Sequence, residues 1–445
     1  MVGAGGGLAS EAAWRDHRGA VDPIAGGTGC RRIYRRDVCE RRRGLISRRA
    51  AWVVVGLLWV VALLNYLDRQ VIFSLFPLLR KDLGLTDPEL GLVSAGFLWV
   101  YAFASPFAGY LGDRLGRRRV VLFSLVIWSV VTLLTGLARS FGQLLAARAV
   151  MGLSEAFYIP AALAMISAQH GEATRAKAVS LHQSGIYFGI VLGGVGGGWL
   201  GQHYGWRPVF WGLGAGGVAY GLFLFRALRG EVSGSLEPVP SGGFGRSVLA
   251  ILRVPGFSAV LFVFAAMSLC NWMVYTWLPL FLYDRFHLSL AAAGFASTFY
   301  IQGSGLMGIL LGGWLADSWM KKNERARIWT QALGLFGAAP FLILAGAAST
   351  PVLLYVALVL YGFGRGVYDS NIMPVLCGLI GDEHRATGYG LLNFVGVLVG
   401  GVAAYGAGLV KSTLGLGAAI EIAGVILLVS AFVVLRVPRV VKPIC

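Results

Sequence analysis

Long apolar runs of about 20 residues or more recur along the chain and constrain its fold more than any other feature. Each run is long enough to cross roughly 30 Å of hydrocarbon as a helix. Twelve runs can be counted, at about 51–79, 89–111, 120–138, 141–167, 177–200, 208–228, 257–282, 290–316, 328–348, 352–378, 386–410 and 416–436. A composition of 57% hydrophobic and 13% charged residues agrees with a chain that spends most of its length in lipid.

The hydrogen-bonding needs of the backbone decide the secondary structure of these runs. An unsatisfied amide is costly in hydrocarbon, so each crossing must be a helix or part of a closed β-barrel. The runs show no alternation of apolar and polar residues, which barrel strands require. The sequence therefore predicts an all-α integral membrane protein with twelve transmembrane helices.

Basic residues predict the orientation of these helices. The net charge is +17, and most lysines and arginines lie in residues 1–50 or in the alternate connectors on the same side. Cytoplasmic connectors carry such an excess, so we expect both termini in the cytoplasm and a multi-pass protein of the plasma (inner) membrane. This charge distribution favours a lipid bilayer and no nucleic-acid partner. Residues 1–50 lack the apolar core of a signal peptide, and we expect a disordered basic tail or sequence upstream of a misplaced start.

A connector rich in Gly, Ser and Pro divides the twelve runs into six and six. Short motifs also recur in the two halves, as "GYLGD" at 109–113 does in "GWLAD" at 313–317. Two six-helix repeats with a substrate site between them are typical of transporters. We therefore expect two pseudo-symmetric six-helix bundles, at 51–228 and 257–436, a cytoplasmic loop between them at 229–256, and a cytoplasmic C-terminal tail at 437–445.

The connector after the second run carries a specific motif. "GYLGDRLGRRR", residues 109–119, resembles the signature loop of the major facilitator superfamily of transporters, and "GGWLADSWMKK" is its degenerate counterpart. The glycines permit a tight turn, and the arginines hold that turn in the cytoplasm. The resemblance implies the major facilitator fold and a gate at this loop. The gating residues that it implies are Gly109, Asp113, Arg114, Gly116, Arg117 and Arg118.

Charged residues inside the apolar runs mark the candidate site. Each costs on the order of 3 kcal/mol or more at mid-bilayer, so it should face a wet cavity or the protein interior. An arginine is permanently cationic and its planar fork fits a carboxylate, whereas desolvation favours the protonated form of a carboxyl group. An anionic substrate and an acidic side chain would then compete for one guanidinium, which couples their binding. The charged residues are Asp68 and Arg69 in the first run, Arg148 and Glu155 in the fourth, and Arg365 and Asp369 in the tenth.

Arg365 and Asp369 are four residues apart, close enough to pair directly on one helix. An ion pair that only stabilises the structure remains the alternative for these two residues. Where the first half has Asp68 and Arg69, the second half has Val274 and Tyr275, so the first-half charges are no shared packing feature.

A closer resemblance rests on "NYLDR" at 65–69 and "RAVMGLSEA" at 148–156. Together they resemble the anion:cation symporter family of organic-anion and sugar-acid carriers. The resemblance implies that Arg69 binds a substrate carboxylate, that Asp68 and Glu155 are protonation sites, and that Arg148 tunes Glu155. It also implies substrate contacts by Tyr66, Tyr101 and Asn393, and we add Tyr275 and Arg365 as candidates in the same cavity.

Other aromatic and apolar residues modify this interpretation. Trp99, Trp272 and Trp277 would make the cavity aromatic, although such residues are as often interfacial. Ile186 stands where sugar-acid carriers have a polar amide, which disfavours a polyhydroxylated substrate.

Glycines predict close helix packing. Five glycines between 185 and 201 recur at period four in the fifth run, and Gly308 and Gly312 form a shorter row in the eighth. Such rows let another backbone approach closely, and a contact between the fifth and eighth helices would suit a rocking interface, although ordinary packing is as good an explanation.

The sequence therefore predicts a secondary transporter that moves a small organic anion with protons, and in which a monomer suffices. Spinster-like transporters share the same motifs, so a lysolipid or sphingoid lipid is the alternative cargo. A receptor or membrane enzyme is a third class, which no nucleophile motif, metal spacing or phosphate loop supports. We expect no catalytic residue, metal or cofactor, and we assign the five cysteines no role.

Overall fold

The computed structural model describes residues 48–228, 244–381 and 384–438, and nearly all of them are helical. The helices before the long connector are α2 (Arg48–Ser74), α3 (Phe76–Leu83), α4 (Asp87–Leu115), α5 (Arg117–Thr135), α6 (Phe141–Glu155), α7 (Tyr158–Gln169), α8 (Glu172–Tyr204) and α9 (Trp206–Ala227). The helices after it are α10 (Phe244–Leu252), α11 (Phe257–Phe286), α12 (Leu290–Met320), α13 (Ala326–Ala347), α14 (Pro351–Asp369), α15 (Ile372–Leu379) and α16 (Arg385–Val434).

The helices are long and apolar enough to account for twelve membrane crossings. Eleven segments within the described residues qualify as spans, and the last of them, Thr387–Val434, has 48 residues. A crossing needs only about 20 residues, so this segment is long enough for two. Gly415, with φ 83° and ψ 163°, interrupts α16 at the point where the chain turns between the two crossings. The predicted all-α fold with twelve transmembrane helices is confirmed.

Local chemistry sets the helix ends. Thr86 caps α4 and forms a capping box with Glu89, whose carboxylate accepts a hydrogen bond from the Thr86 backbone N–H at 2.8 Å. Gly116, between α4 and α5, has φ 87°, a conformation that a residue with a side chain adopts only under strain. This supports the expectation that a glycine permits the tight turn in the motif at 109–119.

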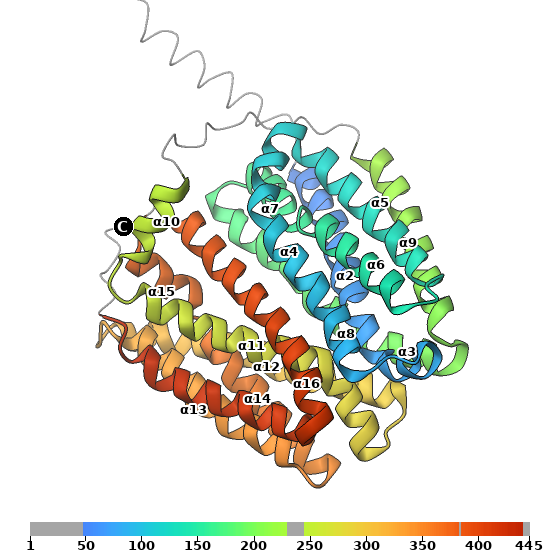
Figure 1. Ribbon diagram of the computed structural model, residues 1–445. Helices are drawn as coiled ribbons and strands as arrows, with labels where there is room; N and C mark the ends of the chain where they lie inside the picture. The colour runs from blue at the N-terminus through green and yellow to red at the C-terminus, as the bar shows by residue number, and fades with distance from the viewer. Residues whose placement is uncertain (1–47, 229–243, 382–383, 439–445) are drawn as a thin grey trace, which may run out of the picture. The chain divides into compact units, whose positions relative to one another are not determined.

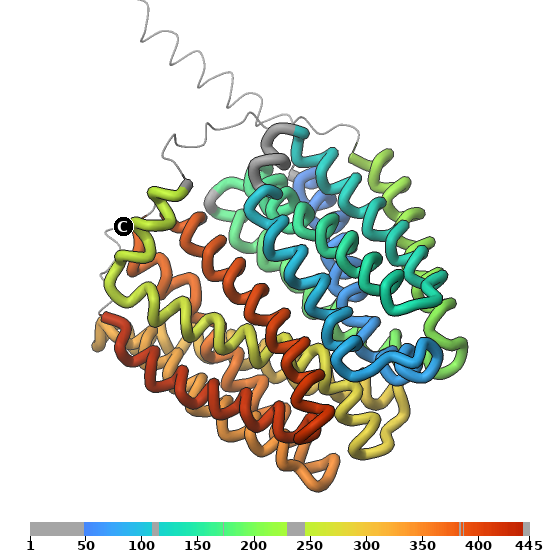
Figure 2. The backbone as a smooth tube through the Cα atoms, viewed as in Figure 1, coloured from blue at the N-terminus to red at the C-terminus, as the bar shows by residue number. Residues whose placement is uncertain are grey.

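The helices form two bundles, α2–α9 and α11–α16, drawn from blue to green and from yellow to red (Figure 1). Within the first bundle α5 packs on α9 and α4 on α6, and within the second α11 packs on α16 and α12 on α14. The two bundles meet along two helix pairs, α4 with α16 and α8 with α12. The tube through the Cα atoms shows α16 running beside α4 across this interface (Figure 2).

The fourth and tenth crossings are each broken after an acidic residue. Helix α6 ends at Glu155 and α7 begins at Tyr158, while α14 ends at Asp369 and α15 begins at Ile372. Each break therefore skips two residues, at corresponding places in the two bundles. This repetition is a structural expression of the pseudo-symmetry.

Large apolar side chains on the outer faces of the helices remain exposed, as expected for lipid contact. Phe107, Leu310 and Trp314 are 67%, 66% and 69% exposed. Contiguous apolar surface of this kind is rare on soluble monomers.

The second part of the predicted connector at 229–256 contains a short helix, α10. Residues 229–243 lie outside the described residues, but α10 is helical, and Ile251 on it is fully buried against the second bundle. The apolar residues of "FGRSVLAIL" supply this packing face. The exact domain boundaries stay predictions, and residues 1–47 and 439–445 lie outside the description.

Candidate functional site

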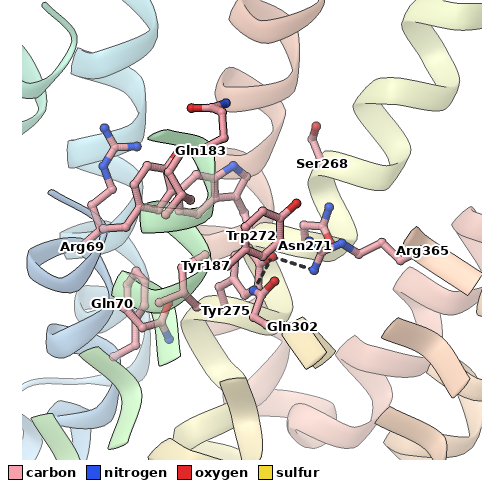
Figure 3. A pocket seen from close by; sticks show the side chains of 14 residues that line it. Arg69, Gln70, Gln183, Tyr187, Ser268, Asn271, Trp272, Tyr275, Gln302 and Arg365 are labelled. Atoms are coloured by element: carbon pink, nitrogen blue, oxygen red, sulfur yellow. Dashed lines mark hydrogen bonds between the residues drawn. The ribbon is translucent and has the colours of Figure 1, made fainter. Parts of the chain in front are cut away.

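A cavity of about 280 Å³ lies between the two bundles. Helices α2 and α8 form its wall in the first bundle, and α11, α12 and α14 form its wall in the second. Figure 3 shows Arg69 and Arg365 on opposite sides of it, with side chains of α8 and α11 between them. The lining residues are Tyr66, Arg69, Gln70, Phe73, Gln183, Ile186, Tyr187, Ile190, Ser268, Asn271, Trp272, Tyr275, Gln302 and Arg365.

Arg69 is the cation of the first wall. Its Nε donates a hydrogen bond to Glu155 Oε2, which joins the first and fourth crossings. Its guanidinium carbon lies 4.8 Å from the ring centre of Tyr66 and 4.6 Å from that of Tyr101, within cation–π range. The side chain is 95% buried, yet its Nη2 has no hydrogen-bond partner among the described residues. A buried, unsatisfied donor beside a cavity is suited to bind an oxygen of a ligand.

Asp68 lies next to Arg69 in the chain but points elsewhere. Its Oδ2 accepts a hydrogen bond from Thr132 Oγ1 of α5 at 3.2 Å, and it is not among the residues that line the cavity. Successive residues on a helix are about 100° apart, so one face of α2 serves the cavity and the next serves the bundle interior. Asp68 is 4% exposed and therefore sits inside the first bundle.

Arg148 is also buried inside the first bundle. Its guanidinium carbon lies 4.6 Å from the ring centre of Phe97, and its Nη1 contacts the sulfur of Met151 at 3.0 Å. It forms no ion pair with another described residue, although it interacts electrostatically with Glu155 and Asp68 at longer range. This long-range placement is compatible with the predicted tuning of Glu155, which stays a prediction.

Arg365 is the cation of the opposite wall. Its Nη1 donates a hydrogen bond to the hydroxyl of Tyr275 at 2.7 Å, and its Nε donates to Asp369 Oδ2 at 3.2 Å. Gln302 of α12 donates to the same Tyr275 hydroxyl at 3.0 Å (Figure 3). The predicted pairing of Arg365 with Asp369 is thus present in the structure.

Two of the other predicted substrate contacts are not among the cavity-lining residues. The ring of Tyr101 contacts the guanidinium of Arg69 but does not line the cavity, and Tyr101 is 8% exposed. Asn393 on α16 is half-buried and outside the lining set. Of the three tryptophans, Trp272 lines the cavity, whereas Trp99 and Trp277 donate hydrogen bonds to backbone carbonyls of α16 at 3.2 Å and 2.8 Å. The expectation that all three make the cavity aromatic is therefore wrong for Trp99 and Trp277, because their ring nitrogens bond to α16.

The predicted gating residues are described only in part. The side chains of Asp113 and Arg114 lie outside the description, and Gly109 is described only as part of the backbone of α4. Arg117 donates a hydrogen bond to the Ala164 carbonyl at 3.2 Å, and Arg118 donates to the Phe225 carbonyl at 2.9 Å. Both contacts stay within the first bundle, so the gating role of this loop stays a prediction.

The end of the bundles away from Gly116 is closed by ion pairs that join the two halves. Arg80 of α3 contacts Asp284 of α11 at 2.7 Å, and Lys411 of α16 contacts Asp87 of α4 at 2.6 Å. We call these four residues the inter-bundle latch; Lys411 also reaches Asp284 at 3.2 Å. Deeper on the same side, the hydroxyls of Ser94 and Thr276 are 3.0 Å apart across the interface. These contacts hold the two bundles together on this side of the cavity.

Sequence reasoning missed most of the amide side chains that line the cavity. Gln70, Asn271 and Gln302 lie well inside apolar runs, and Gln183 lies near the start of one. Their signal was available, because a polar residue in a transmembrane helix usually faces the interior. Nothing in the sequence, however, says which interior amides share one cavity.

Among the described residues, the titratable side chains show no arrangement typical of a metal site. No group of three or more His, Cys, Asp or Glu side chains that could hold a metal occurs within the described part of the chain.

Comparison with protein families gives one match that spans most of the chain. The model of the Major Facilitator Superfamily matches residues 58–404 and, a second time, 297–443. The two matches overlap and together cover nearly all of the described helices.

Curated proteins and solved structures give further similarities. The chain is 28% identical over 374 residues to an MFS-type efflux pump of Mycolicibacterium smegmatis, covering 82% of this chain and 86% of that one. It is 26% identical over 379 residues to a probable galactarate/D-glucarate transporter of Escherichia coli, covering 78% and 77%. The crystal structure of a bacterial homologue of the human lysosomal transporter spinster, inward-facing and unoccupied, matches with a TM-score of 0.79 at 21% identity, covering 88% of this chain and 98% of that one. At that identity the last likeness concerns the fold alone.

Proposed function

Because this chain belongs to the major facilitator superfamily and is a multi-pass membrane transporter, we propose that it carries a small organic carboxylate together with protons by alternating access. The observation that carries the proposal is that Arg69 lines the cavity between the bundles and is paired with the buried carboxylate of Glu155 behind it. The relative that is named as a probable galactarate/D-glucarate transporter also supports an organic-anion cargo.

The pair of Arg69 and Glu155 gives a direct mechanism for coupling. A substrate carboxylate that reaches Arg69 competes with Glu155 for the same guanidinium, whose Nη2 is still free to donate. Once displaced, Glu155 is a buried carboxylate without its counter-ion and takes up a proton, because an unpaired buried charge is costly. The loaded site then holds the anion and the proton together, and neither binds as well alone.

Asp68 supplies a second place for a proton in the first bundle, at a distance from the cargo. Its hydrogen bond from Thr132 places it in the bundle interior, where it does not contact the cavity. We assign Arg148 the role of a fixed positive charge that acts on both Asp68 and Glu155.

The ion pairs at the latch end support one state of the proposed transport cycle. With both termini in the cytoplasm, as the basic connectors favour, the latch lies on the outer side of the plasma membrane and the protein faces inward. One chain contains both bundles and the cavity, so a monomer is sufficient for transport.

The alternative cargo is a lysolipid, as in spinster-like transporters. The similarity in fold to the spinster homologue leaves it open, whereas the cavity volume favours the smaller cargo. Pockets for drug-sized ligands run from about 300 to 1,000 Å³, and about 280 Å³ lies just below that range. The lining also presents two guanidiniums and four amides, which suit a compact polar anion better than an acyl chain.

Uptake into proteoliposomes tests the proposal. The full chain is reconstituted, and entry of radiolabelled succinate and gluconate is followed with and without a pH gradient. We expect gradient-driven uptake of a carboxylate, and Arg69→Ala should reduce it by roughly 10- to 100-fold, because charge-assisted hydrogen bonds contribute about 1.5–3 kcal/mol. Arg253→Ala, at an exposed arginine outside the cavity, is the matched control and should transport normally.

Two results would overturn the assignment. Wild-type rates in Arg69→Ala would show that this arginine does not bind the cargo. Competition by lysophosphatidylcholine, with none by any carboxylate, would select the lipid cargo instead.

A further inference from the structure

We propose that Arg365 is a second anion-binding site and that the cargo is a short dicarboxylate, which bridges Arg69 in the first bundle and Arg365 in the second. This inference rests on the proposed function and specifies its substrate class. The two arginines line one cavity from opposite walls (Figure 3).

Arg365 is arranged to bind a ligand. It is 6% exposed, and Tyr275 and Asp369 hold its Nη1 and Nε. Its Nη2 has no hydrogen-bond partner within the part of the chain that the structure describes. A guanidinium that is oriented by two contacts and still has a free donor loses little freedom on binding a carboxylate.

The alternative, that Arg365 and Asp369 only stabilise the structure, does not fit their positions. Both residues lie on α14, four residues apart, so their ion pair links no two helices. Desolvation of the buried Arg365 and the partly buried Asp369 costs free energy, and an intrahelical pair of this kind recovers only part of that cost. Among the described residues, the hydrogen bond to Tyr275 is the only one that Arg365 donates to another helix. A neutral donor could make this hydrogen bond as well.

The two bundles share one arrangement, in which an acidic residue at a helix end pairs with a cavity-lining arginine. Glu155 ends α6 and holds Arg69, and Asp369 ends α14 and holds Arg365, each just before a two-residue break in its crossing. Each wall therefore carries an arginine neutralised by a carboxylate. A monocarboxylate can take the place of only one of these acidic side chains at its arginine. A dicarboxylate can take the place of both, so that each arginine binds one carboxylate of the ligand.

The middle of the cavity suits a short connecting chain. Its volume of about 280 Å³ limits the ligand to a small molecule. Gln70 Nε2 and Gln302 Oε1 are buried without hydrogen-bond partners among the described residues, so the cavity-lining residues offer one further donor and one further acceptor. Ile186 and Trp272 give the remaining surface an apolar character that fits methylene groups.

Binding to the purified full chain tests the inference. The probes are succinate against butyrate and adipate against hexanoate, two pairs that differ only in the second carboxylate. In the wild type we expect at least one dicarboxylate to half-saturate at a concentration roughly 10-fold or more below that of its partner, as a charge-assisted hydrogen bond implies. Arg365→Gln should abolish this difference, and measurable binding of the monocarboxylate at Arg69 would show that the variant is folded.

The outcomes separate this inference from the proposed function. If the wild type binds both members of each pair equally and Arg69→Ala loses both, the dicarboxylate inference fails and the proposed function stands. If no carboxylate binds at all, both fail. An unchanged preference in Arg365→Gln would also overturn the inference. If Arg365→Gln binds neither probe, a second variant decides. Tyr275→Phe keeps the pair of Arg365 with Asp369, and the inference holds only if this variant weakens the preference for the dicarboxylate.

Discussion

At the scale of single residues, the neighbours Asp68 and Arg69 on the first crossing have different surroundings. Arg69 reaches the cavity and Glu155, whereas Asp68 accepts a hydrogen bond from Thr132 inside the first bundle. The residue that would meet the cargo and the residue that would hold a second proton therefore lie on different faces of α2. Cargo binding and this second protonation should be separable by mutation.

We predict that Asp68→Asn separates them. The variant keeps Arg69 and the cavity, so exchange of internal for external carboxylate across the membrane should continue near the wild-type rate. Accumulation driven by a pH gradient should fall from the roughly hundredfold that two coupled protons can support per pH unit toward the tenfold that the proton on Glu155 alone supports. Counterflow and gradient-driven uptake in the same vesicles measure the two quantities.

Asp317→Asn is the control for this charge change, because Asp317 is exposed and pairs only with Arg327 among the described residues. It should preserve both activities. Loss of exchange together with accumulation in Asp68→Asn would mean that Asp68 is needed for cargo binding itself.

At the scale of helices, glycines on α8 set its contacts with two neighbours. A Cβ at Gly185 or Gly193 would lie 2.7 Å from a backbone oxygen of α2, so the period-four row packs against the first crossing. A Cβ at Gly194 would lie 2.6 Å from the Gly294 oxygen of α12, across the interface between the bundles. The expected contact between the fifth and eighth helices is present, but Gly308 and Gly312 do not form it. A Cβ at Gly312 would instead meet Val367 of α14.

We predict that Gly193→Ala destabilises the protein, because the added methyl group meets the backbone of α2, which cannot move aside cheaply. Overpacking of this kind costs about 1–3 kcal/mol. Gly196→Ala on the same helix is the matched control, since a Cβ there has nothing within 4 Å. Thermal unfolding in detergent, followed by tryptophan fluorescence, should show a lower midpoint for Gly193→Ala only. Equal midpoints would contradict the packing argument.

At the scale of the whole transporter, the ion pairs that join the bundles among the described residues lie at one end. The latch of Arg80, Asp87, Asp284 and Lys411 lies there, and so does the hydrogen bond of Ser94 with Thr276. The four latch side chains are partly exposed, so each ion pair contributes only about 0–1 kcal/mol. Several weak pairs can hold one end closed and still allow it to open during a transport cycle.

We predict that Lys411→Gln shifts the population toward states open at the latch end. The variant removes both contacts that Lys411 makes to acids, and a loss of about 1 kcal/mol changes the ratio of states roughly fivefold. Spin labels at Gln202 and Ser349, exposed near this end of the two bundles, would report the change in a cysteine-free background. Double electron–electron resonance should show a longer distance gaining population.

Asp82→Asn is the control for this experiment. Asp82 lies near the same end, but Arg207 and Trp206 of its own bundle donate hydrogen bonds to it. These contacts lower the pKa of Asp82, so the carboxylate is ionised under the conditions of the measurement. The substitution removes a surface ion pair without touching the interface, and the distance distribution should not change. A shift as large as that of Lys411→Gln would show that the latch is not what holds the bundles together.

The sequence by itself determined the twelve crossings, their helical nature and the expensive charges within them. These features depend on hydrocarbon thickness and on backbone hydrogen bonding, which act on each segment locally. Only the tertiary structure decided that Arg69 and Arg365 share one cavity while Asp68 does not, and that Trp99 and Trp277 bond to α16. It also assigned Gln70 and Gln302 to the cavity and paired Lys411 with Asp87. Residues so far apart in the chain meet because helices pack by shape, and no local pattern encodes which faces of two distant helices come together.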